Sequence, residues 1–327
     1  MKRRSIITAA GLMAMASWRP RGSARSASDI PAAGERWRST LRRDHPLAGA
    51  IWSVADARRV DEQRLSDALR AARNRLLGEV HDNPDHHAIQ LDQLRRLADS
   101  GLTPVVAFEQ FDRDHDAALQ ERLAGGKVTA EDVASAVRFD RSGWNWDFYR
   151  PLVEIALRHG MPLRAANLSS SATARIVKEG LQMLGAERMA ALKLENVWSV
   201  ERERALRREI FEGHCAALPE QSVARMAAAQ RARDATLAEA LLASGPDGAV
   251  LIAGNGHVRR DLAVPLYLRP AGDATCAIGI LEVEAGKKNP RDYLEGGVSL
   301  PPFDFVCFTP AWARPDPCAG FKPRSNL

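Results

Sequence analysis

Short apolar runs alternate with segments of helical spacing along most of this chain, and no other feature of the sequence constrains the fold as strongly. The apolar runs cover residues 75–81, 103–111, 162–168 and 248–257. Apolar residues three or four positions apart predict helices over 86–99, 112–125, 151–159, 171–184, 187–216 and 219–243. Strands separated by helices form βαβ units, so the sequence predicts an α/β fold in which helices flank a mostly parallel sheet. The last two apolar runs, 276–284 and 303–309, have no helix between them and are candidates for antiparallel pairing at one edge.

The positive charge of the chain is concentrated at its beginning. Residues 1–26 hold six of the 46 basic residues and no acidic residue, so the remainder carries 40 basic against 41 acidic residues. This remainder lacks the basic surplus that is typical of nucleic-acid-binding proteins. "MKRR", the short apolar stretch "SIITAAGLMAMAS" and the small residues of "SARSA" follow one another as in an export signal. The paired arginines resemble those of a twin-arginine signal.

The leader and the local composition divide the chain into three parts. We assign 1–26 to a signal peptide, 45–310 to one folded domain and 311–327 to a Pro-rich tail. The apolar stretch of the leader is too short to span a bilayer, and no cysteine that could accept a lipid follows it. We therefore expect a soluble, periplasmic or otherwise exported protein without a lipid anchor.

Four cysteines are present, and an exported protein can pair them in disulfides. They are Cys215, Cys276, Cys307 and Cys318. No pair has the spacing of a zinc ribbon, a dithiol redox centre or a covalent c-type haem site. Cys318, in Pro-rich surroundings, is the best candidate for a disulfide, and the spacing does not indicate its partner.

Polar side chains follow four of the apolar runs, at the point where each predicted strand ends. They are Glu79 and His81, Glu109, Asn167, and Asn255 with His257. The carboxyl ends of parallel strands share one edge of the sheet, and ligands bind in the crevice outside that edge. If the four strands are neighbours, these side chains converge on one site. The alternative is that each of them only caps a turn.

The segment "GNGH" offers a backbone argument for His257. Gly254 and Gly256 permit positive φ and a close approach of a ligand to the main chain, so His257 would be presented on a tight turn. An ordinary solvated turn histidine is the alternative interpretation.

The helix predicted over 219–243 carries polar residues on an apolar row. Gln230 and Asp234 fall between apolar residues three or four positions apart, and Arg233 flanks them. A buried carboxylate needs a partner, so we expect Asp234 to pair with Arg233 or with a strand-end histidine. The network is either structural or part of the site.

Two further segments combine histidine or aromatic residues. In "HDNPDHH", we expect His86 and His87 to lie on the surface in the first turn of a helix. The segment "GWNWDFY" precedes the helix predicted over 151–159 and is interpreted as a packed aromatic corner. Alternatively, it supplies an apolar wall and the phenol of Tyr149 to a planar ligand.

These segments together resemble the ChaN-like family of bacterial haem-binding uptake proteins, which belongs to the superfamily of the Tiki proteases and erythromycin esterases. The resemblance covers about 75–320 and rests on "GEVHDNPDHH", "AFEQFDRD", "SGWNWDFYRPL", "LRAANL", "HCAALPE", "MAAAQRARDATLA", "LIAGNGHVRRDLAVP" and "FTPAWARPDPCAG". It implies an α/β fold, an exported location and the handling of haem or iron. Family members are often lipoproteins, and this leader departs from them in lacking the lipid-accepting cysteine.

The resemblance implies a haem-binding protein of haem or iron uptake, with haem at the carboxyl edge of the sheet. Haem needs an axial ligand, apolar contacts and cations or imidazoles for its propionates. The candidate residues are His81, His257, Tyr149, Glu79, Glu109, Asn167, Gln230, Arg233, Asp234 and Arg259. A hydrolase of the esterase or peptidase type is the alternative, with Glu79, His81, Glu109 and His257 as catalytic residues and with or without a divalent metal. A homodimer and outer-membrane components of haem or iron uptake are candidate partners.

The leader yields a direct prediction. Because "SARSA" offers small residues at the end of the apolar stretch, we expect cleavage near Ser26–Ala27. Intact-mass analysis of protein from a native host should therefore show a mature chain that begins close to Ala27. A mass that retains Met1 or the complete leader would contradict the export assignment.

Overall fold

The computed structural model describes residues 37–320, except for 193, 195–196, 269–271, 273, 295–297 and 299. The predicted signal peptide and the end of the tail lie outside the described residues. In the described part, eight strands form one sheet in the order β2-β1-β8-β7-β3-β6-β4-β5. The strands are β1 Ile51–Ser53, β2 Arg58–Val60, β3 Asn74–Leu77, β4 Val105–Asp112, β5 Leu163–Asn167, β6 Ala249–Ile252, β7 Thr275–Glu282 and β8 Phe305–Thr309.

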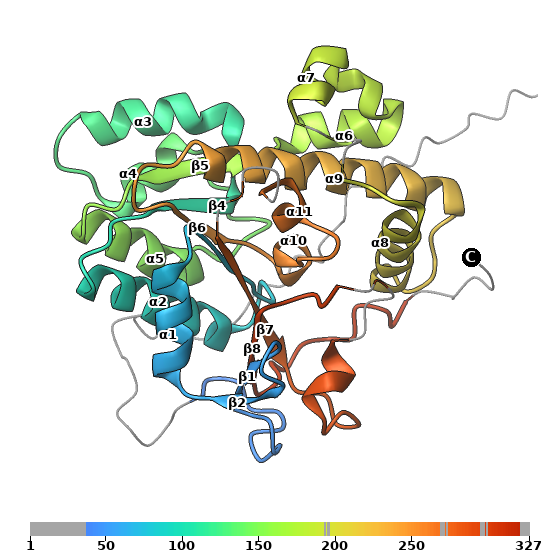
Figure 1. Ribbon diagram of the computed structural model, residues 1–327. Helices are drawn as coiled ribbons and strands as arrows, with labels where there is room; N and C mark the ends of the chain where they lie inside the picture. The colour runs from blue at the N-terminus through green and yellow to red at the C-terminus, as the bar shows by residue number, and fades with distance from the viewer. Residues whose placement is uncertain are drawn as a thin grey trace, which may run out of the picture.

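Helices cover both faces of this sheet (Figure 1). The helices are α1 Glu62–Ala71, α2 Pro84–Asp99, α3 Asp116–Ala124, α4 Ala130–Ala136, α5 Trp146–Arg158, α6 Ser170–Glu179, α7 Ala186–Ala191, α8 Val200–Gly213, α9 Glu220–Leu242, α10 Asn255–Val258 and α11 Val264–Leu268. Short 3-10 turns lie at η1 Arg113–His115, η2 Leu181–Leu184 and η4 Pro290–Tyr293. The predicted α/β fold with a mostly parallel sheet is confirmed.

One of the two late strands, β8, takes part in the antiparallel edge of the sheet, but its antiparallel partner is not the other late strand. β7 pairs in parallel with both β3 and β8, so the two late strands belong to the parallel part. β1 instead pairs antiparallel with β8 and with β2. Each of these two strands is only three residues long, which explains why the sequence pattern did not indicate them.

Alternate residues of the central strands enter two different cores. On β4, Val106 and Phe108 pack with helices α1, α2, α4 and α5 on one face. Val105 and Ala107, the residues between them, pack with α9 and α11 on the other face. Successive side chains of a strand point to opposite sides, and a parallel sheet is covered by helices on both sides, so its strands read as continuous apolar runs.

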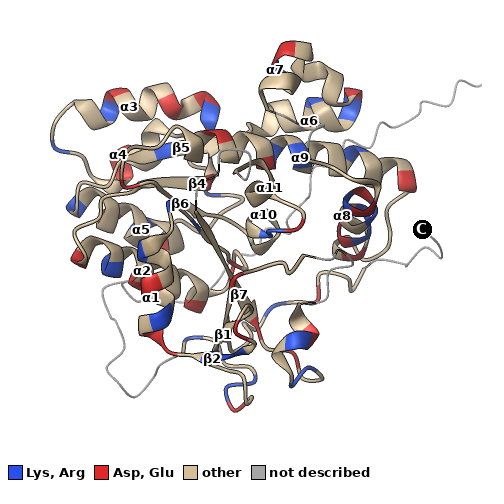
Figure 2. Cartoon of the chain, in the orientation of Figure 1, with Lys and Arg blue, Asp and Glu red and all other residues tan. Residues whose placement is uncertain are grey.

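The boundaries of several helices differ from the sequence-based expectation. Asn145 caps α5 by accepting a hydrogen bond from the amide of Asp147, so the helix begins at Trp146 and continues through Pro151. The second half of the aromatic segment, 146–149, is therefore the first turn of a helix, and only 143–145 precede it. The polar region expected as one helix over 187–216 contains α7 and α8, and α8 carries acidic and basic residues on its surface (Figure 2).

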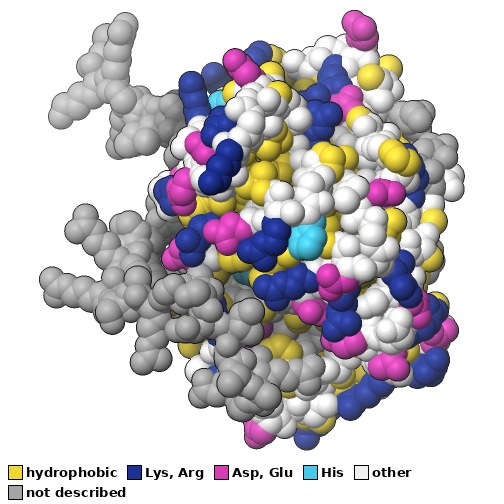
Figure 3. All heavy atoms as spheres, turned by 90° about the vertical axis from the view of Figure 1, so that its left-hand side faces the viewer, with side chains coloured by type: hydrophobic (Ala, Val, Ile, Leu, Met, Phe, Trp, Pro, Cys, Tyr) yellow, Lys and Arg dark blue, Asp and Glu magenta, His cyan; other side chains and the backbone are white. Residues whose placement is uncertain are grey.

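The surface of the described chain shows a mixture of charges. On the face drawn in Figure 3, basic and acidic side chains lie close to one another, with apolar side chains between them. Within the ranges that the structure describes, no helix has both the length and the apolar character required to cross a membrane.

One disulfide joins the end of α8 to the C-terminal segment. Cys215 and Cys318 are bonded, with Cα atoms 5.4 Å apart. Cys276 on β7 and Cys307 on β8 are free thiols in the apolar core, where burial raises the pKa of each thiol above its ordinary value. The expectation that Cys318 is paired is confirmed, and its partner is 103 positions away in the sequence.

We expect this disulfide to contribute substantially to stability. Cross-linking two residues about 100 positions apart restricts the unfolded chain and contributes about 4 kcal/mol in the chain-entropy model. Replacing both Cys215 and Cys318 by Ser should therefore lower the free energy of unfolding by about 2–4 kcal/mol in a urea titration. Thiol labelling of the native wild type should modify neither Cys276 nor Cys307, whereas the denatured protein should react at both. Equal stability of the double variant and the wild type would contradict this assignment.

Candidate functional site

The strands whose ends carry the predicted polar residues are neighbours in the sheet. β3, β6, β4 and β5 lie side by side in that order, and the parallel pairing places their carboxyl ends at one edge. Glu79, His81, Glu109, Asn167 and His257 meet there, with Gln230, Arg233 and Asp234 facing them from α9. The structure thus brings together the residues that the strand-end pattern singled out, except for Asn255, whose side chain bonds to the backbone of Ile280 on β7. Arg259 is placed at the rim, where it pairs with Glu209 and Asp261.

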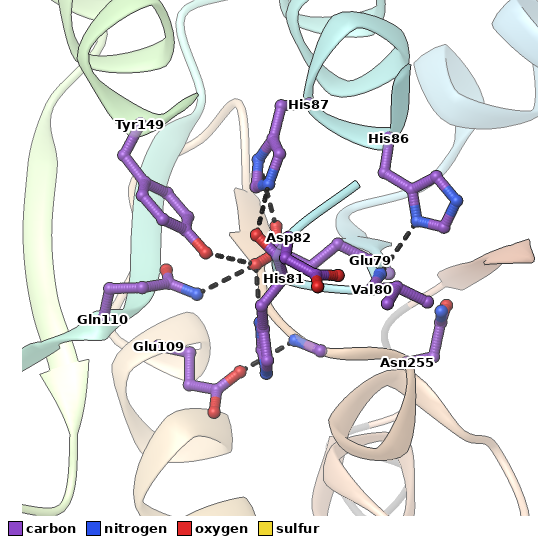
Figure 4. Close-up of polar contacts among 12 residues, drawn as sticks. Glu79, Val80, His81, Asp82, His86, His87, Glu109, Gln110, Tyr149 and Asn255 are labelled. Carbon is purple, nitrogen blue, oxygen red and sulfur yellow. Dashed lines mark hydrogen bonds and ion pairs between the residues drawn. The ribbon is translucent and has the colours of Figure 1, made fainter. Parts of the chain in front are cut away.

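Glu79 is the centre of the first cluster of this site (Figure 4). Its carboxylate is buried, and Oε1 accepts hydrogen bonds from the Tyr149 hydroxyl at 2.6 Å and from Gln110 Nε2 at 3.1 Å. Nδ1 of His81 lies 2.8 Å from the same oxygen. Burial acts to raise the pKa of Glu79. His87, His81 and Tyr149 lower the pKa by more than burial raises it, so on balance it falls below its ordinary value. Glu79 is therefore an ionised carboxylate that fixes the side chains around it.

Helix α2 supplies residues to this cluster that the sequence did not indicate. Gln90 Nε2 donates to Glu79 Oε2 at 2.8 Å, and His87 Nδ1 lies 3.6 Å from that oxygen. His87 Nε2 lies 3.0 Å from the carbonyl oxygen of His81. His86 accepts a hydrogen bond from the amide of Val80. The expectation that His86 and His87 lie on the surface is wrong, because the helix begins directly at the sheet edge and its first turn faces the site.

The signal for these residues lies in their spacing. His86 and His87 lie four and three positions before Gln90, so each of them is a neighbour of Gln90 on the surface of a helix that begins at Pro84. A polar face in the first turn is equally typical of a solvated helix, however. Only the position of α2 against Glu79 separates the two interpretations.

Gln110 reaches the site because β4 is irregular. The pairing of β4 with β5 shifts between Phe108 and Asp112, so that four steps on β4 match two steps on β5. In a regular strand Glu109 and Gln110 would point to opposite faces, whereas both are buried at the site edge here. Such bulges redirect side chains and are common beside functional sites.

Glu109 is the centre of the second cluster. Arg233 Nη2 donates to Oε1 at 2.6 Å, and the amide of Gly254 donates to Oε2 at 2.7 Å. His257 Nε2 lies 3.2 Å from Oε1. Asn167 accepts a hydrogen bond from Arg233 Nε at 3.2 Å and donates to the carbonyl oxygen of Glu109 at 2.8 Å. Although burial acts to raise the pKa of Glu109, His257 and the neighbouring cations hold it well below its ordinary value.

His257 is enclosed between two carboxylates. Its Nδ1 lies 2.6 Å from Asp234 Oδ1, so the predicted pairing of Asp234 with a strand-end histidine is observed. Burial lowers the pKa of His257, but Glu109 and Asp234 raise it to about 9 on balance. Burial raises the pKa of Asp234 to about 6 against the effect of His257. At neutral pH the ring is therefore a buried imidazolium, and Gln230 Nε2 lies 3.1 Å from its Nδ1.

Gly254 has a different role from the one expected. Its φ is −56°, and His257 lies on the short helix α10 and not on a turn with positive φ. A Cβ atom on Gly254 would lie 2.8 Å from His81 Cε1 and 3.0 Å from His81 Nε2. Glycine is thus required here for the close approach of the His81 ring to the backbone.

His81 differs from the other site residues in its access to solvent. Its side chain is 40% exposed, whereas the side chains of Glu79 and His257 are 0% and 5% exposed. Nδ1 is engaged by Glu79, and Nε2 has no hydrogen-bond partner among the described residues. The ring of Trp144 meets the imidazole edge to face, with centroids 4.7 Å apart. His81 is therefore a half-exposed ring with one nitrogen engaged by Glu79 and the other, Nε2, close to Gly254 and without a hydrogen-bond partner among the described residues.

Two limits on the chemistry of the edge follow from the described residues. Among them, no group of three or more His, Cys, Asp or Glu side chains is arranged to hold a metal ion. Tyr149 is fully buried in α5 and donates to Glu79, so its hydroxyl is not at the surface. The arrangement offers one accessible imidazole, oriented by a carboxylate, above a sealed cluster of compensated charges.

Comparison with solved structures finds several proteins to which this chain is similar, and the similarity to the first of them extends to the fold. ChaN of Campylobacter jejuni, whose structure is described as showing cofacial haem binding, is 18% identical and gives a TM-score of 0.61 over 79% of this chain and 95% of that chain. A mutant of the erythromycin esterase EreC in its open conformation is 14% identical, with a TM-score of 0.40 over 77% of this chain and 80% of that chain. The type III effector HopBA1 is 13% identical, with a TM-score of 0.36 over 75% and 91%. None of the curated proteins compared with the chain matches it.

Comparison with protein-family models gives a match over residues 65–268, which is more than half of the chain. The matching family is described as "Haem-binding uptake, Tiki superfamily, ChaN". The matched segment contains β3, β4, β5 and β6 and every residue of the two clusters built around Glu79 and Glu109. The chain belongs to this family of ChaN-like haem-binding uptake proteins.

Proposed function

We propose that this chain is an exported haem-binding protein of haem or iron uptake, and that His81 Nε2 is the axial ligand of the haem iron. The observation that carries this proposal is a half-exposed imidazole ring in which one nitrogen is fixed by a buried carboxylate and the other has no hydrogen-bond partner among the described residues. Metal-binding histidines usually donate their second ring N–H to a carboxylate, which fixes the tautomer and makes the ligand more basic. When bound, haem supplies an iron whose axial position an imidazole can fill.

The three candidate ligands differ in how well they fit haem. His257 has both ring nitrogens engaged, by Asp234 and Glu109, and its charge is compensated inside the protein. Tyr149 is buried and donates to Glu79. His81 alone of the three combines exposure, a free nitrogen and an adjacent aromatic ring, that of Trp144. The residues present therefore fit a haem ligand at His81 without rearrangement of the buried network.

Export and uptake are supported by the order of charges and apolar residues in 1–26 and by the description of the family. A homodimer is compatible with the proposal because His81 occupies one axial position only. One similar protein is described as binding haem cofacially. Sedimentation of the haem-loaded and the haem-free protein would show whether haem makes this chain dimerise.

A hydrolase is the second candidate, and it rests on the same pair of residues. A carboxylate that holds one nitrogen of an imidazole leaves the other as a general base, as in Ser-His-Asp triads. Glu79 and His81 have this geometry. Glu109 is held by Arg233 and the amide of Gly254, so in this function it would stabilise charge and not accept a proton.

Haemin titration tests the proposed function. Wild-type protein should give a Soret band that shifts and saturates at one haem per chain. His81→Ala should change the position of the bound Soret band and weaken binding by at least about tenfold, because the iron loses its axial ligand. Glu79→Gln should keep the ligand but weaken binding by about 10- to 100-fold, because it removes the carboxylate that orients the ring.

His159→Ala is the matched control for these variants. His159 is exposed at the end of α5, so its loss should leave both the spectrum and the affinity at their wild-type values. Wild-type binding by His81→Ala would reject His81 as the ligand. The hydrolase is the correct function under a different pair of results. In that case neither the wild type nor any variant shifts the Soret band, and the wild type cleaves an ester substrate that His81→Ala does not cleave.

The affinity for haemin should depend on pH in a defined direction. Burial lowers the pKa of His81, but the hydrogen bond to Glu79 and the charge of Glu109 raise it above 6.5 on balance. Iron binds only the neutral ring, so protonation competes with haemin at a higher pH than for a free histidine. As the pH is lowered from 9 to 5, the affinity should begin to fall while the pH is still above 6.5 and should then decrease about tenfold for each further pH unit. A constant affinity over this range would contradict ligation by His81.

A further inference from the structure

The C-terminal segment 310–320 returns to the loop that carries His81. Arg314 Nε and Nη2 donate to the two carboxylate oxygens of Asp82, at 2.8 Å and 2.7 Å. Its Nη1 and Nη2 also donate to Glu282 at the end of β7, both at 2.7 Å. Asp82 directly follows His81 in the sequence. We call the segment 310–320 the C-terminal strap.

The contacts of Arg314 differ from those of an ordinary surface ion pair. An isolated exposed pair contributes little to stability, because water and salt screen it. A guanidinium held by two carboxylates through four hydrogen bonds has a defined geometry and lower conformational freedom. Glu282 is 15% exposed, and it also accepts hydrogen bonds from Asn83 Nδ2 at 2.6 Å and from the amide of Trp312 at 3.1 Å. Asn83 is the N-cap of α2, so Glu282 ties the strap to the start of that helix.

The other end of the strap is covalently fixed. Cys318 is bonded to Cys215, which lies two residues after the end of α8. α8 in turn contacts the site through Glu209, whose carboxylate lies 3.0 Å from Arg259, two residues after His257. A continuous set of contacts therefore runs from the His81 loop through the strap, the disulfide and α8 to the His257 segment.

We propose that Arg314 is a positioning residue for His81, and that the disulfide-anchored strap holds the loop in the conformation that presents His81 Nε2 to a ligand. This inference rests on the proposed role of His81 in binding. Glu79 fixes the His81 ring from inside the protein, and Arg314 fixes the adjacent residue from outside. With both restraints the backbone from Glu79 to Asn83 is held on two sides of His81.

The test compares Arg314→Gln with Arg96→Gln in the full-length protein. Arg96 pairs with Asp92 on the exposed side of α2. Its variant therefore makes the same chemical change, Arg to Gln, at an ordinary surface ion pair away from the site. Arg314→Gln should weaken haemin binding by about threefold to tenfold and shift the bound Soret band, while Arg96→Gln should match the wild type in both. Asp82→Asn should change binding in the same direction, and the double variant should bind no more weakly than Arg314→Gln alone, because Asp82 acts through its pair with Arg314.

Cys215→Ser/Cys318→Ser should show the same spectral change at a temperature where circular dichroism confirms a folded protein. If Arg314→Gln binds haemin with the wild-type spectrum and affinity while His81→Ala does not, the positioning role is rejected and the proposed function stands. If the wild type binds no haemin, the proposed function fails, and amide hydrogen exchange of residues 79–83 decides on the strap alone. Faster exchange in Arg314→Gln than in Arg96→Gln then supports the positioning role, and equal exchange rejects it.

Discussion

The buried carboxylate of Glu79 is the interaction on which the organisation of the site depends. An ionised carboxylate removed from water is strongly destabilising unless several donors compensate it. Its partners come from the loop after β3, from α2, β4 and α5, and they are His81, His87, Gln90, Gln110 and Tyr149. Each donor fixes one element against the end of β3. The direction of the His81 ring is consequently set by the protein interior, although the ring itself is half exposed.

The second carboxylate, Glu109, is buried like Glu79, but its main histidine partner, His257, is buried too. Arg233, His257 and the amide of Gly254 surround it, and Asp234 balances the second nitrogen of His257. This cluster keeps its charges paired inside the protein and leaves no nitrogen of His257 for a ligand. Its proximity to His81 still matters, because the negative charge of Glu109 raises the pKa of the exposed imidazole. One cluster thus orients the proposed ligand group, His81, and the other sets the electrostatic surroundings of that group.

The sequence predicted those parts of the fold and site that depend on local patterns. Long apolar runs gave the central strands, and polar residues at their ends predicted the convergence of Glu79, Glu109 and His257, because parallel strands place their carboxyl ends together. β1 and β2 were missed because three residues are too few to establish a period. The contribution of Gln110 was missed because it depends on a bulge in β4, which is a property of the pairing with β5. The partner of Cys318 was not predictable, since the two cysteines meet only through the tertiary path of the strap.

The candidate ligands differ in burial, which the sequence does not encode directly. His81, Tyr149 and His257 were all candidates from the sequence, and the position at which α5 begins explains why Tyr149 is buried whereas His81 is half exposed. Had α5 begun at Pro151, Tyr149 would lie in a turn with its hydroxyl open to a ligand. Because Asn145 caps the helix, Tyr149 lies in its first turn, facing inward, and its hydroxyl donates to Glu79. Tyr149, which the sequence suggested as a phenolate ligand, therefore acts on the proposed ligand indirectly: it helps to keep Glu79 ionised, and Glu79 orients His81.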